Sequence, residues 1–229
     1  MRAFAILSGE GLSFFDAFSV LEACGIMSPS NVIIISDREC PALYIAMERG
    51  FQTELIENSN NTSFSRKAYN VCSTFSAEFG ILSFSRLVTV DLFGRIRTFN
   101  VHPALLPAYK GLGALRKAMN DKVRFIGATL HAVTEDVDSG PIVAQAVSPI
   151  CADWDEENLR RVSYIQKIYL FLSLFWLLGH GFFDYNFREV IWKKSTRCTY
   201  TCNPSIDDPC LKSHFSYFQK NIGMECLLL

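Results

Sequence analysis

Three polar side chains in the middle of the sequence have the chemistry that acyl transfer needs. Asn100 and His102 stand two residues apart in the segment Phe99–Pro103. Side chains at i and i+2 of an extended strand point to the same face, so the amide and the imidazole can face one pocket. Asp138 comes later, directly before a Ser-Gly-Pro turn. An amide donor, a titratable imidazole and a carboxylate form a candidate acyl-transfer set.

The segments that must position these side chains predict an α/β fold. Short apolar runs alternate with helical patterns, and repeated strand–helix units favour a parallel sheet. We therefore expect an open, mostly parallel twisted sheet with helices on both faces. The predicted strands are 4–8, 31–36, 51–56, 80–84, 96–101, 125–133 and 142–147. The predicted helices are 14–21, 41–49, 63–75, 114–119 and 153–178, with Ser63 and Asp153 as expected N-caps.

The central segment resembles the folate-dependent formyltransferases. That family carries Asn-x-His-Pro-x-Leu-Leu-Pro with a glycine just beyond, then an apolar strand with a histidine, and then Asp-x-Gly-Pro. Here the same pieces occur in the same order, as 100–107, Gly111, 127–133 and 138–141. The resemblance implies a Rossmann-like formyltransferase domain over residues 1–183, followed by an irregular C-terminal tail of unknown role over residues 184–229.

The resemblance also implies an activity. The family transfers a formyl group from 10-formyltetrahydrofolate, a co-substrate, to a primary amine. Glycinamide ribonucleotide, an intermediate of purine biosynthesis, is the expected acceptor; another amine such as an amino-sugar nucleotide, or a non-catalytic folate-binding homologue, is the alternative. Asn100 and His102 would stabilise the developing oxyanion, while Asp138 would pair with His102 and help to move a proton. No metal is expected.

The folate contacts are also assigned by the resemblance. They are Arg86, Leu87, Val88, Val133 and Asp138. Ligands of open parallel sheets lie beyond the carboxyl ends of the strands, which suits the segment after the fourth predicted strand. A solvated strand-end charge is the alternative for Arg86. His131 matches a histidine close to the family's catalytic group, and a core histidine is an equal alternative.

The acceptor is expected at the turn after the first strand, where the family binds phosphate through Ser-Gly-x-Gly-Ser-Asn. The residues assigned to it are Gly9, Gly11, Leu12 and Ser13. A strand, a glycine turn and a helix leave backbone N–H groups free to bind an anion, and a tight turn without a ligand is the alternative. Leu12 replaces the family's serine. On the last helix, Ser163 and Gln166 stand where the family uses Gln and Glu to hold the acceptor.

Composition narrows the range of partners. The 229-residue chain has a formal net charge of -1, which does not favour a nucleic-acid partner. The apolar run 3–7 is too short for a signal-peptide core. The run 168–178 falls short of the roughly 20 apolar residues of a membrane span, so a buried packing helix is expected there. We expect a cytoplasmic protein that binds small molecules, and the oligomeric state is not predicted.

The cysteines are scattered, and free thiols in a reduced protein are expected. Four of the eight sit among apolar neighbours, where a cysteine acts as a small hydrophobe: Cys24, Cys40, Cys72 and Cys151. The C-terminal region offers four potential soft-metal ligands: Cys198, Cys202, Cys210 and His214. A zinc site and an irregular tail with free thiols are the two alternatives there.

Overall fold

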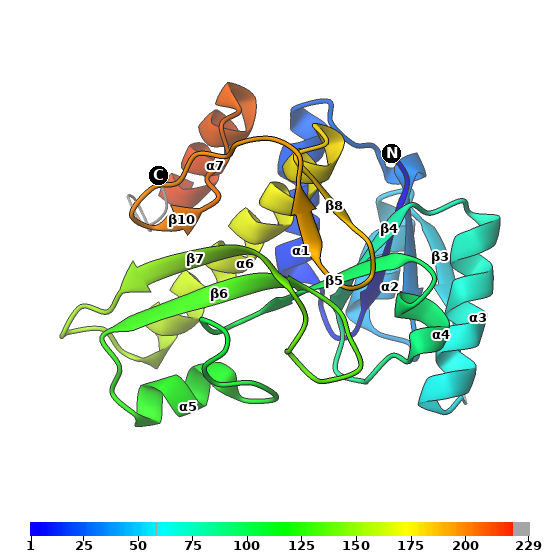
Figure 1. Cartoon of the computed structure of the whole chain (residues 1–229), viewed down its shortest axis with the longest axis horizontal. Helices are drawn as coiled ribbons and strands as arrows, with labels where there is room; N and C mark the ends of the chain where they lie inside the picture. The colour runs from blue at the N-terminus through cyan, green and yellow to red at the C-terminus, as the bar shows by residue number, and fades with distance from the viewer. Residues whose placement is uncertain (58, 222–229) are drawn as a thin grey trace.

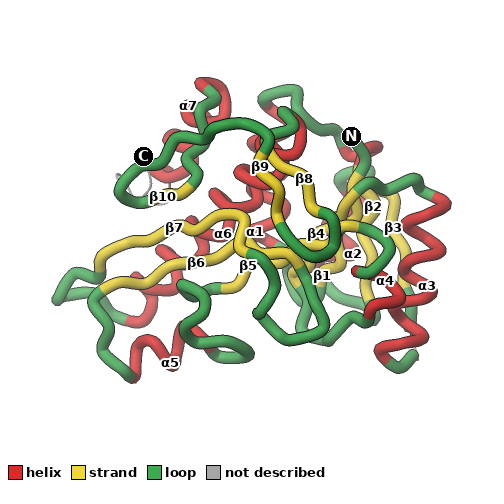
Figure 2. Tube along the Cα trace, in the orientation of Figure 1, coloured by secondary structure: helices red, strands yellow, loops and turns green. Residues whose placement is uncertain are grey.

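The computed structural model describes residues 1–57 and 59–221. Its central feature is an eight-stranded sheet in the order β10-β7-β6-β5-β4-β1-β2-β3, beside a hairpin of β8 and β9 (Figure 2). The strands are β1 (Ala3–Leu7), β2 (Val32–Ser36), β3 (Gln52–Leu55), β4 (Phe79–Ser83), β5 (Arg97–His102), β6 (Phe125–Ala132), β7 (Ile142–Pro149), β8 (Phe183–Tyr185), β9 (Val190–Trp192) and β10 (Cys202–Asn203).

The sheet is parallel from β3 to β5 and antiparallel beyond β5. The strand order reverses between β1 and β4, so the loops after these strands begin side by side. The N–H of Ser8 donates to the carbonyl of Ser83 at 3.1 Å and links the two loops. The expected α/β architecture is confirmed, and the point where the strand order changes is where such sheets bind ligands.

Helices cover both faces of the sheet (Figure 1). Alternation along β1 explains this arrangement: Ala3, Ala5 and Leu7 face the core beneath α1, α2 and α6, while Phe4 and Ile6 face α3 and α4. The helices are α1 (Leu12–Ala23), α2 (Pro41–Glu48), α3 (Asn61–Thr74), α4 (Val90–Phe93), α5 (Ala114–Asn120), α6 (Glu156–Gly179) and α7 (Pro209–Asn221), with a 3₁₀ turn at Pro29–Asn31.

The two predicted N-caps are wrong by a few residues. The side chain of Asn60, not Ser63, accepts a hydrogen bond from the first turn of α3, and Asp155, not Asp153, does so for α6. In each case the cap bonds the N–H three residues on, which for Asn60 belongs to Ser63 itself. A cap must stand just outside the helix, and both helices begin at positions that the apolar pattern does not mark.

Helix α6 is long and apolar enough to cross a membrane by length and composition. Yet 78% of its most apolar window is buried inside the fold. Leu170, Leu172 and Leu174 are fully buried in the main core, and Leu172 lies on the side of the helix opposite to the other two. Burial on all sides explains the uninterrupted apolar run, and α6 is the packing helix expected from the sequence.

The C-terminal region is not the irregular tail that was expected. It contains β8, β9, β10 and α7 among its described residues, and β10 extends the sheet by pairing with β7. Phe183 and Tyr185 of β8 each pack their ring 5.9 Å from that of Phe99 on β5. Helix α7 packs against α1 and α6 (Figure 1). These contacts are long-range and leave no local pattern; the domain boundary at residue 183 stays a prediction.

The expectation that Cys24 is a free thiol is wrong. Cys24 and Cys210 form a disulfide that joins the end of α1 to the beginning of α7. Four other described cysteines are free thiols: Cys40, Cys72, Cys151 and Cys198. A pair separated by 186 residues in the sequence can be recognised only after folding has brought the two helices together.

Candidate active site

Asn100 and His102 project from the same face of β5, as their spacing predicts. The strand lies between β4 and β6 in the interior of the sheet, so its backbone is fixed on both sides. His102 is buried, and Asn100 is half-buried. Pro103 follows directly and ends the strand, which leaves the imidazole at the strand's carboxyl end.

Asp138 reaches His102 from the loop between β6 and β7. Its carboxylate oxygen Oδ2 lies 3.1 Å from Nδ1 of His102, and only 9% of its side chain is exposed. The same oxygen accepts the N–H of Gly111 at 2.8 Å. Asp138 has φ of +49°, a left-handed conformation that carboxylate and amide residues adopt more readily than most. The loop thus turns its carboxylate back over the strand.

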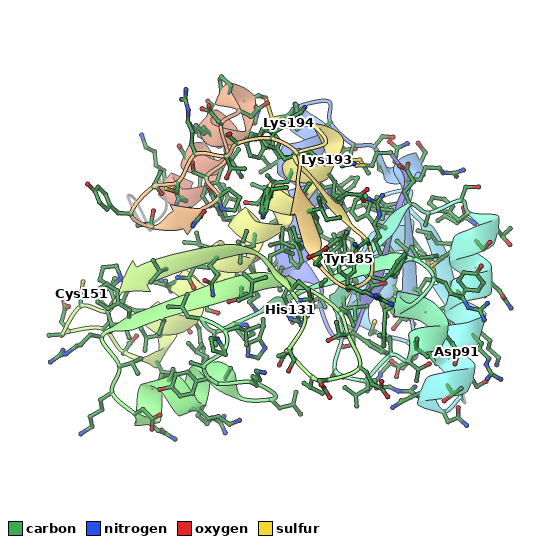
Figure 3. All side chains as sticks on the ribbon, viewed as in Figure 1. Asp91, His131, Cys151, Tyr185, Lys193 and Lys194 are labelled. Carbon is green, nitrogen blue, oxygen red and sulfur yellow. A yellow bond between two sulfur atoms is a disulfide. The ribbon has the colours of Figure 1, made fainter. Side chains whose placement is uncertain are left out.

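His131 connects Asn100 with Asp138. It is the register partner of Asn100 across β5 and β6 and lies near the centre of the molecule (Figure 3). Its Nε2 is 3.3 Å from the amide nitrogen of Asn100 and 3.4 Å from Oδ1 of Asp138. Nδ1 donates to the Ala132 carbonyl at 3.0 Å, so Nε2 accepts from Asn100 in the neutral ring and donates to Asp138 in the charged ring.

The electrostatics of this cluster favour an ionised Asp138. Burial opposes the charged form of the carboxylate. The hydrogen bonds from His131 and from the Gly111 N–H, together with the positive charge that His102 and His131 can carry, outweigh burial and hold the pKa of Asp138 below its usual range. A carboxylate surrounded by donors is therefore present at neutral pH next to two imidazoles.

The loop after β5 closes the cluster on its other side. Nε2 of His102 donates to the Tyr109 carbonyl at 2.8 Å, and Lys110 Nζ donates to the Ser139 hydroxyl at 2.7 Å. Tyr109 and Gly111 both have positive φ. Sequence reasoning placed Gly111 in a motif but missed its N–H as a partner of Asp138. The pairing of its backbone with a side chain 27 residues away has no local signal.

The predicted folate segment lies after β4, and its side chains differ in exposure and in hydrogen-bond partners. Leu87 is exposed, while Val88 and Val133 are half-buried against the same part of the core. The Arg86 guanidinium is neither a solvated charge nor free for a ligand. It donates to Asp37 at 3.0 Å, to the Ser59 carbonyl at 2.7 Å and to the Asn61 side chain. The hydrogen bond from Arg38, and after it that from Arg86, outweigh burial and lower the pKa of Asp37.

The turn after β1 has the backbone geometry of an anion cradle. Gly9 and Gly11 have φ of +76° and +66°, and Gly11 is the residue before α1. The first N–H groups of a helix have no partner within it. A side chain at Gly9 would meet open space, whereas one at Gly11 would come within 3.2 Å of Leu7, Ala42 and Phe15. Of these two glycines, Gly9 therefore tolerates the added volume of a side chain and Gly11 does not. Leu12 is exposed, and Ser13 is buried.

The two residues of α6 that align with the family's acceptor contacts face the protein interior. Ser163 is buried, and the Gln166 amide donates to the Ser148 hydroxyl at 3.0 Å and lies 3.3 Å from the Ile126 carbonyl. Gln166 therefore joins α6 to the sheet. A side chain in this position does not reach an acceptor outside the fold.

Three comparisons place the chain among known proteins. A family model described as formyl transferase matches residues 1–169. A phosphoribosylglycinamide formyltransferase of Mycobacterium tuberculosis is 32% identical over 173 residues, which cover 71% of this chain and 80% of that protein. A formyltetrahydrofolate deformylase of Arabidopsis thaliana is 44% identical over 68 residues, 30% of this chain and 19% of that protein.

A solved structure shares the fold. The glycinamide ribonucleotide transformylase 1 of Symbiobacterium toebii superposes with a TM-score of 0.74 at 27% identity, over 85% of this chain and 94% of that one. The family model covers about three quarters of the sequence and includes Asn100, His102 and Asp138. The chain therefore belongs to the formyltransferase family.

Proposed function

We propose that the chain transfers a formyl group from 10-formyltetrahydrofolate to the primary amine of glycinamide ribonucleotide. The observation that carries the proposal is the cluster at the end of β5, where His102 lies 3.1 Å from Asp138 and Asn100 lies 3.3 Å from His131. The relatives that are named for formyl transfer to phosphoribosylglycinamide support this acceptor. When bound, 10-formyltetrahydrofolate supplies the formyl carbon that the amine attacks.

Asn100 and His102 are the proposed oxyanion donors. Negative charge grows on the formyl oxygen as the amine adds, and fixed N–H donors stabilise it without reorganisation. His131 and Asp138 fix the two side chains from behind. The Nε2–H of His102 donates to the Tyr109 carbonyl, so the formyl oxygen would have to replace that acceptor.

Asp138 is the proposed proton carrier. Its lowered pKa keeps it ionised at neutral pH. The carboxylate can accept a proton from the attacking amine and pass it to the leaving nitrogen, directly or through water. Its bonds to His102 and to the Gly111 N–H hold it in one orientation during this step. No Ser or Cys nucleophile is needed.

The proposed folate site uses apolar side chains and backbone. Leu87, Val88 and Val133 offer apolar surface to a flat ring, and the first of them is 58% exposed. Arg86 would contribute through its backbone, because its guanidinium is engaged by Asp37, Ser59 and Asn61. The acceptor phosphate would lie beside Gly9, at the first N–H groups of α1.

Hydrolysis of 10-formyltetrahydrofolate is the second candidate function. On the acceptor side, Leu12 presents an exposed apolar side chain and Gln166 faces the sheet. Loss of amine contacts with an intact catalytic cluster is what a water acceptor would require. The identity to a formyltetrahydrofolate deformylase over 68 residues supports this candidate.

One assay separates the two candidates. The full chain is incubated with 10-formyltetrahydrofolate, with and without glycinamide ribonucleotide, and the formylated amine and free formate are measured. We expect formylated amine, and we expect Asn100→Ala and His102→Ala each to lower the rate by about 10²–10³-fold. Formate without formylated amine would select hydrolysis. Absence of both products would leave a non-catalytic homologue or another amine acceptor, which a panel of amines then tests.

The same proposal places the enzyme in the cytoplasm with small molecules as its partners. The burial of α6 inside the fold supports this location, because a buried helix is not available as a membrane anchor. The cellular location follows from fractionation of cells that express the full chain, and recovery with the membrane fraction would contradict it.

A further inference from the structure

Three side chains with soft ligand atoms meet far from the cluster on β5. They are Cys24, Cys210 and His214. Nδ1 of His214 lies 3.6 Å from the sulfur of Cys24 and 3.6 Å from the sulfur of Cys210. All three ligand atoms lie within 4.8 Å of one another, and among the described residues this is the group that could hold a metal ion.

Two helices build this group. Cys24 directly follows α1, where Gly25 with φ of +66° turns the chain away. Cys210 and His214 are four residues apart on α7, so they lie on one face of that helix. Helix α7 packs against α1 (Figure 1), and this contact brings the third ligand to the pair.

The spacing of the sulfur and nitrogen atoms suits a tetrahedral zinc ion. Bond lengths of about 2.3 Å to sulfur and about 2.0–2.1 Å to nitrogen put the ligand atoms about 3.6 Å apart at the tetrahedral angle. Both sulfur–nitrogen distances already have that value. The two sulfur atoms would have to separate from bonding distance to about 3.8 Å, which side-chain rotation after reduction can supply.

We propose that the reduced chain binds one zinc ion through the sulfur atoms of Cys24 and Cys210 and Nδ1 of His214. The disulfide and the zinc complex are then alternative states of one site. A dithiol reductant supplies two electrons and two protons to the S–S bond, leaving two thiols and its own disulfide. Zinc binding releases both thiol protons, so two thiolates balance the charge of the ion.

His214 must change its tautomer for this role. Its Nδ1 lies 3.0 Å from the Cys210 carbonyl and donates a proton to it in the disulfide state. In the zinc state the ring turns so that Nδ1 faces the two sulfur atoms instead of the Cys210 carbonyl, and the proton is carried by Nε2, whose N–H can donate to solvent because His214 is exposed. The exposed side also leaves the fourth tetrahedral position open to water.

The ligand set differs from the one that the sequence suggested. Cys202 is buried on β10 and Cys198 is exposed, and neither lies in the group. The proposed zinc site therefore combines Cys210 and His214 of the C-terminal region with Cys24, which lies 186 residues before Cys210 in the chain. The proposed ion would clip α7 to α1 in a reducing compartment, where the disulfide does not persist.

Zinc titration of the full chain tests the proposal. The protein is reduced with a phosphine, freed of metal with a chelator, and titrated with zinc chloride against a colorimetric indicator. We expect one tightly bound zinc per chain in the wild type. We expect Cys24→Ser, Cys210→Ser and His214→Ala to lose that zinc, whereas Cys151→Ser and Cys198→Ser keep it. Cys151 is an exposed thiol in the loop between β7 and α6 (Figure 3).

Two further measurements keep the test independent of folding defects. The oxidised wild type, which carries no mutation, should bind no zinc until it is reduced. Cobalt in place of zinc should give the visible and thiolate charge-transfer bands of a tetrahedral site in the reduced wild type, and His214→Ala should change them. A reduced wild type without stoichiometric zinc, or ligand variants with unchanged affinity, would overturn the proposal.

Discussion

At the scale of single residues, Asp138 has the most partners within the cluster. It contacts His102, His131 and the Gly111 N–H, and its left-handed backbone aims it at them. Replacing Asp138 by asparagine removes the negative charge and almost preserves the shape of the side chain. The neighbouring Asp136 is exposed on the same loop and offers a matched control.

We expect Asp138→Asn to lower the turnover of the formyl-transfer reaction by about 10²–10⁴-fold, because proton transfer and the support of His102 are lost together. Asp136→Asn should stay within a few-fold of the wild type. Steady-state kinetics with both substrates varied gives the result. An Asp138→Asn enzyme of nearly normal turnover would remove the carboxylate from the proposed mechanism.

The lowered pKa of Asp138 also predicts how stability depends on pH. A carboxyl group whose folded pKa is depressed stabilises the fold above its unfolded pKa of about 3.9, and this contribution is lost as the pH falls through the folded value. The difference in free energy of unfolding between wild type and Asp138→Asn should thus be constant near pH 5–7 and shrink below about pH 3.9. Urea titrations at several pH values measure it; a difference that grows toward acid pH contradicts the assigned direction.

At the scale of elements, β5 and the two loops beside it contribute different groups to the cluster. The strand holds Asn100 and His102 rigidly, with β4 and β6 on either side. The loops contribute groups that only tertiary contacts fix, such as the Tyr109 carbonyl and the Gly111 N–H. Residues on loops that a rigid strand supports are a common way to build a functional site.

The beginning of α3 gives a test of element boundaries. Asn60 caps the helix by accepting the N–H of Ser63 at 2.8 Å. Asn60→Ala should therefore lower the free energy of unfolding by about 1 kcal/mol, the usual cost of losing an N-cap. Ser63→Ala should cost less, since the cap uses the Ser63 backbone and not its hydroxyl. Equal losses in chemical unfolding would show that the Ser63 hydroxyl supports the helix start as much as the Asn60 side chain does.

At the scale of the whole molecule, the C-terminal region closes the fold. β10 pairs with β7 at the edge of the sheet, β8 packs against Phe99, and α7 is tied to α1 by the Cys24–Cys210 disulfide. A crosslink over 186 residues restricts the unfolded chain strongly. Its effect should therefore be seen in global unfolding.

In the oxidised, metal-free protein, Cys24→Ser should lower the free energy of unfolding by about 2–4 kcal/mol through loss of the crosslink. Cys198→Ser removes an exposed free thiol and should change it little. Denaturant unfolding with a chelator present, and without reductant, makes the comparison. Equal stability of the wild type and Cys24→Ser would mean that the crosslink does not form in solution.

Local features of this protein follow from its sequence alone. Apolar runs and helical periodicity predicted the strands from β1 to β7 and most helices, because both patterns depend on near neighbours. The spacing of Asn100 and His102 put them on one face, since side chains alternate along a strand. The family resemblance supplied Asp138 as their partner, and the structure brings it to His102.

Contacts between distant groups depend on the packing of the whole fold. The antiparallel register of β5 and β6 puts His131 opposite Asn100, which settles its place beside the cluster. The ion pair with Asp37 occupies the Arg86 guanidinium, which was expected from the sequence to contact folate. The approach of α7 to α1 joins Cys24 with Cys210 and His214. Each of these contacts links residues far apart along the chain, and their partners depend on how whole elements pack, which no local pattern specifies.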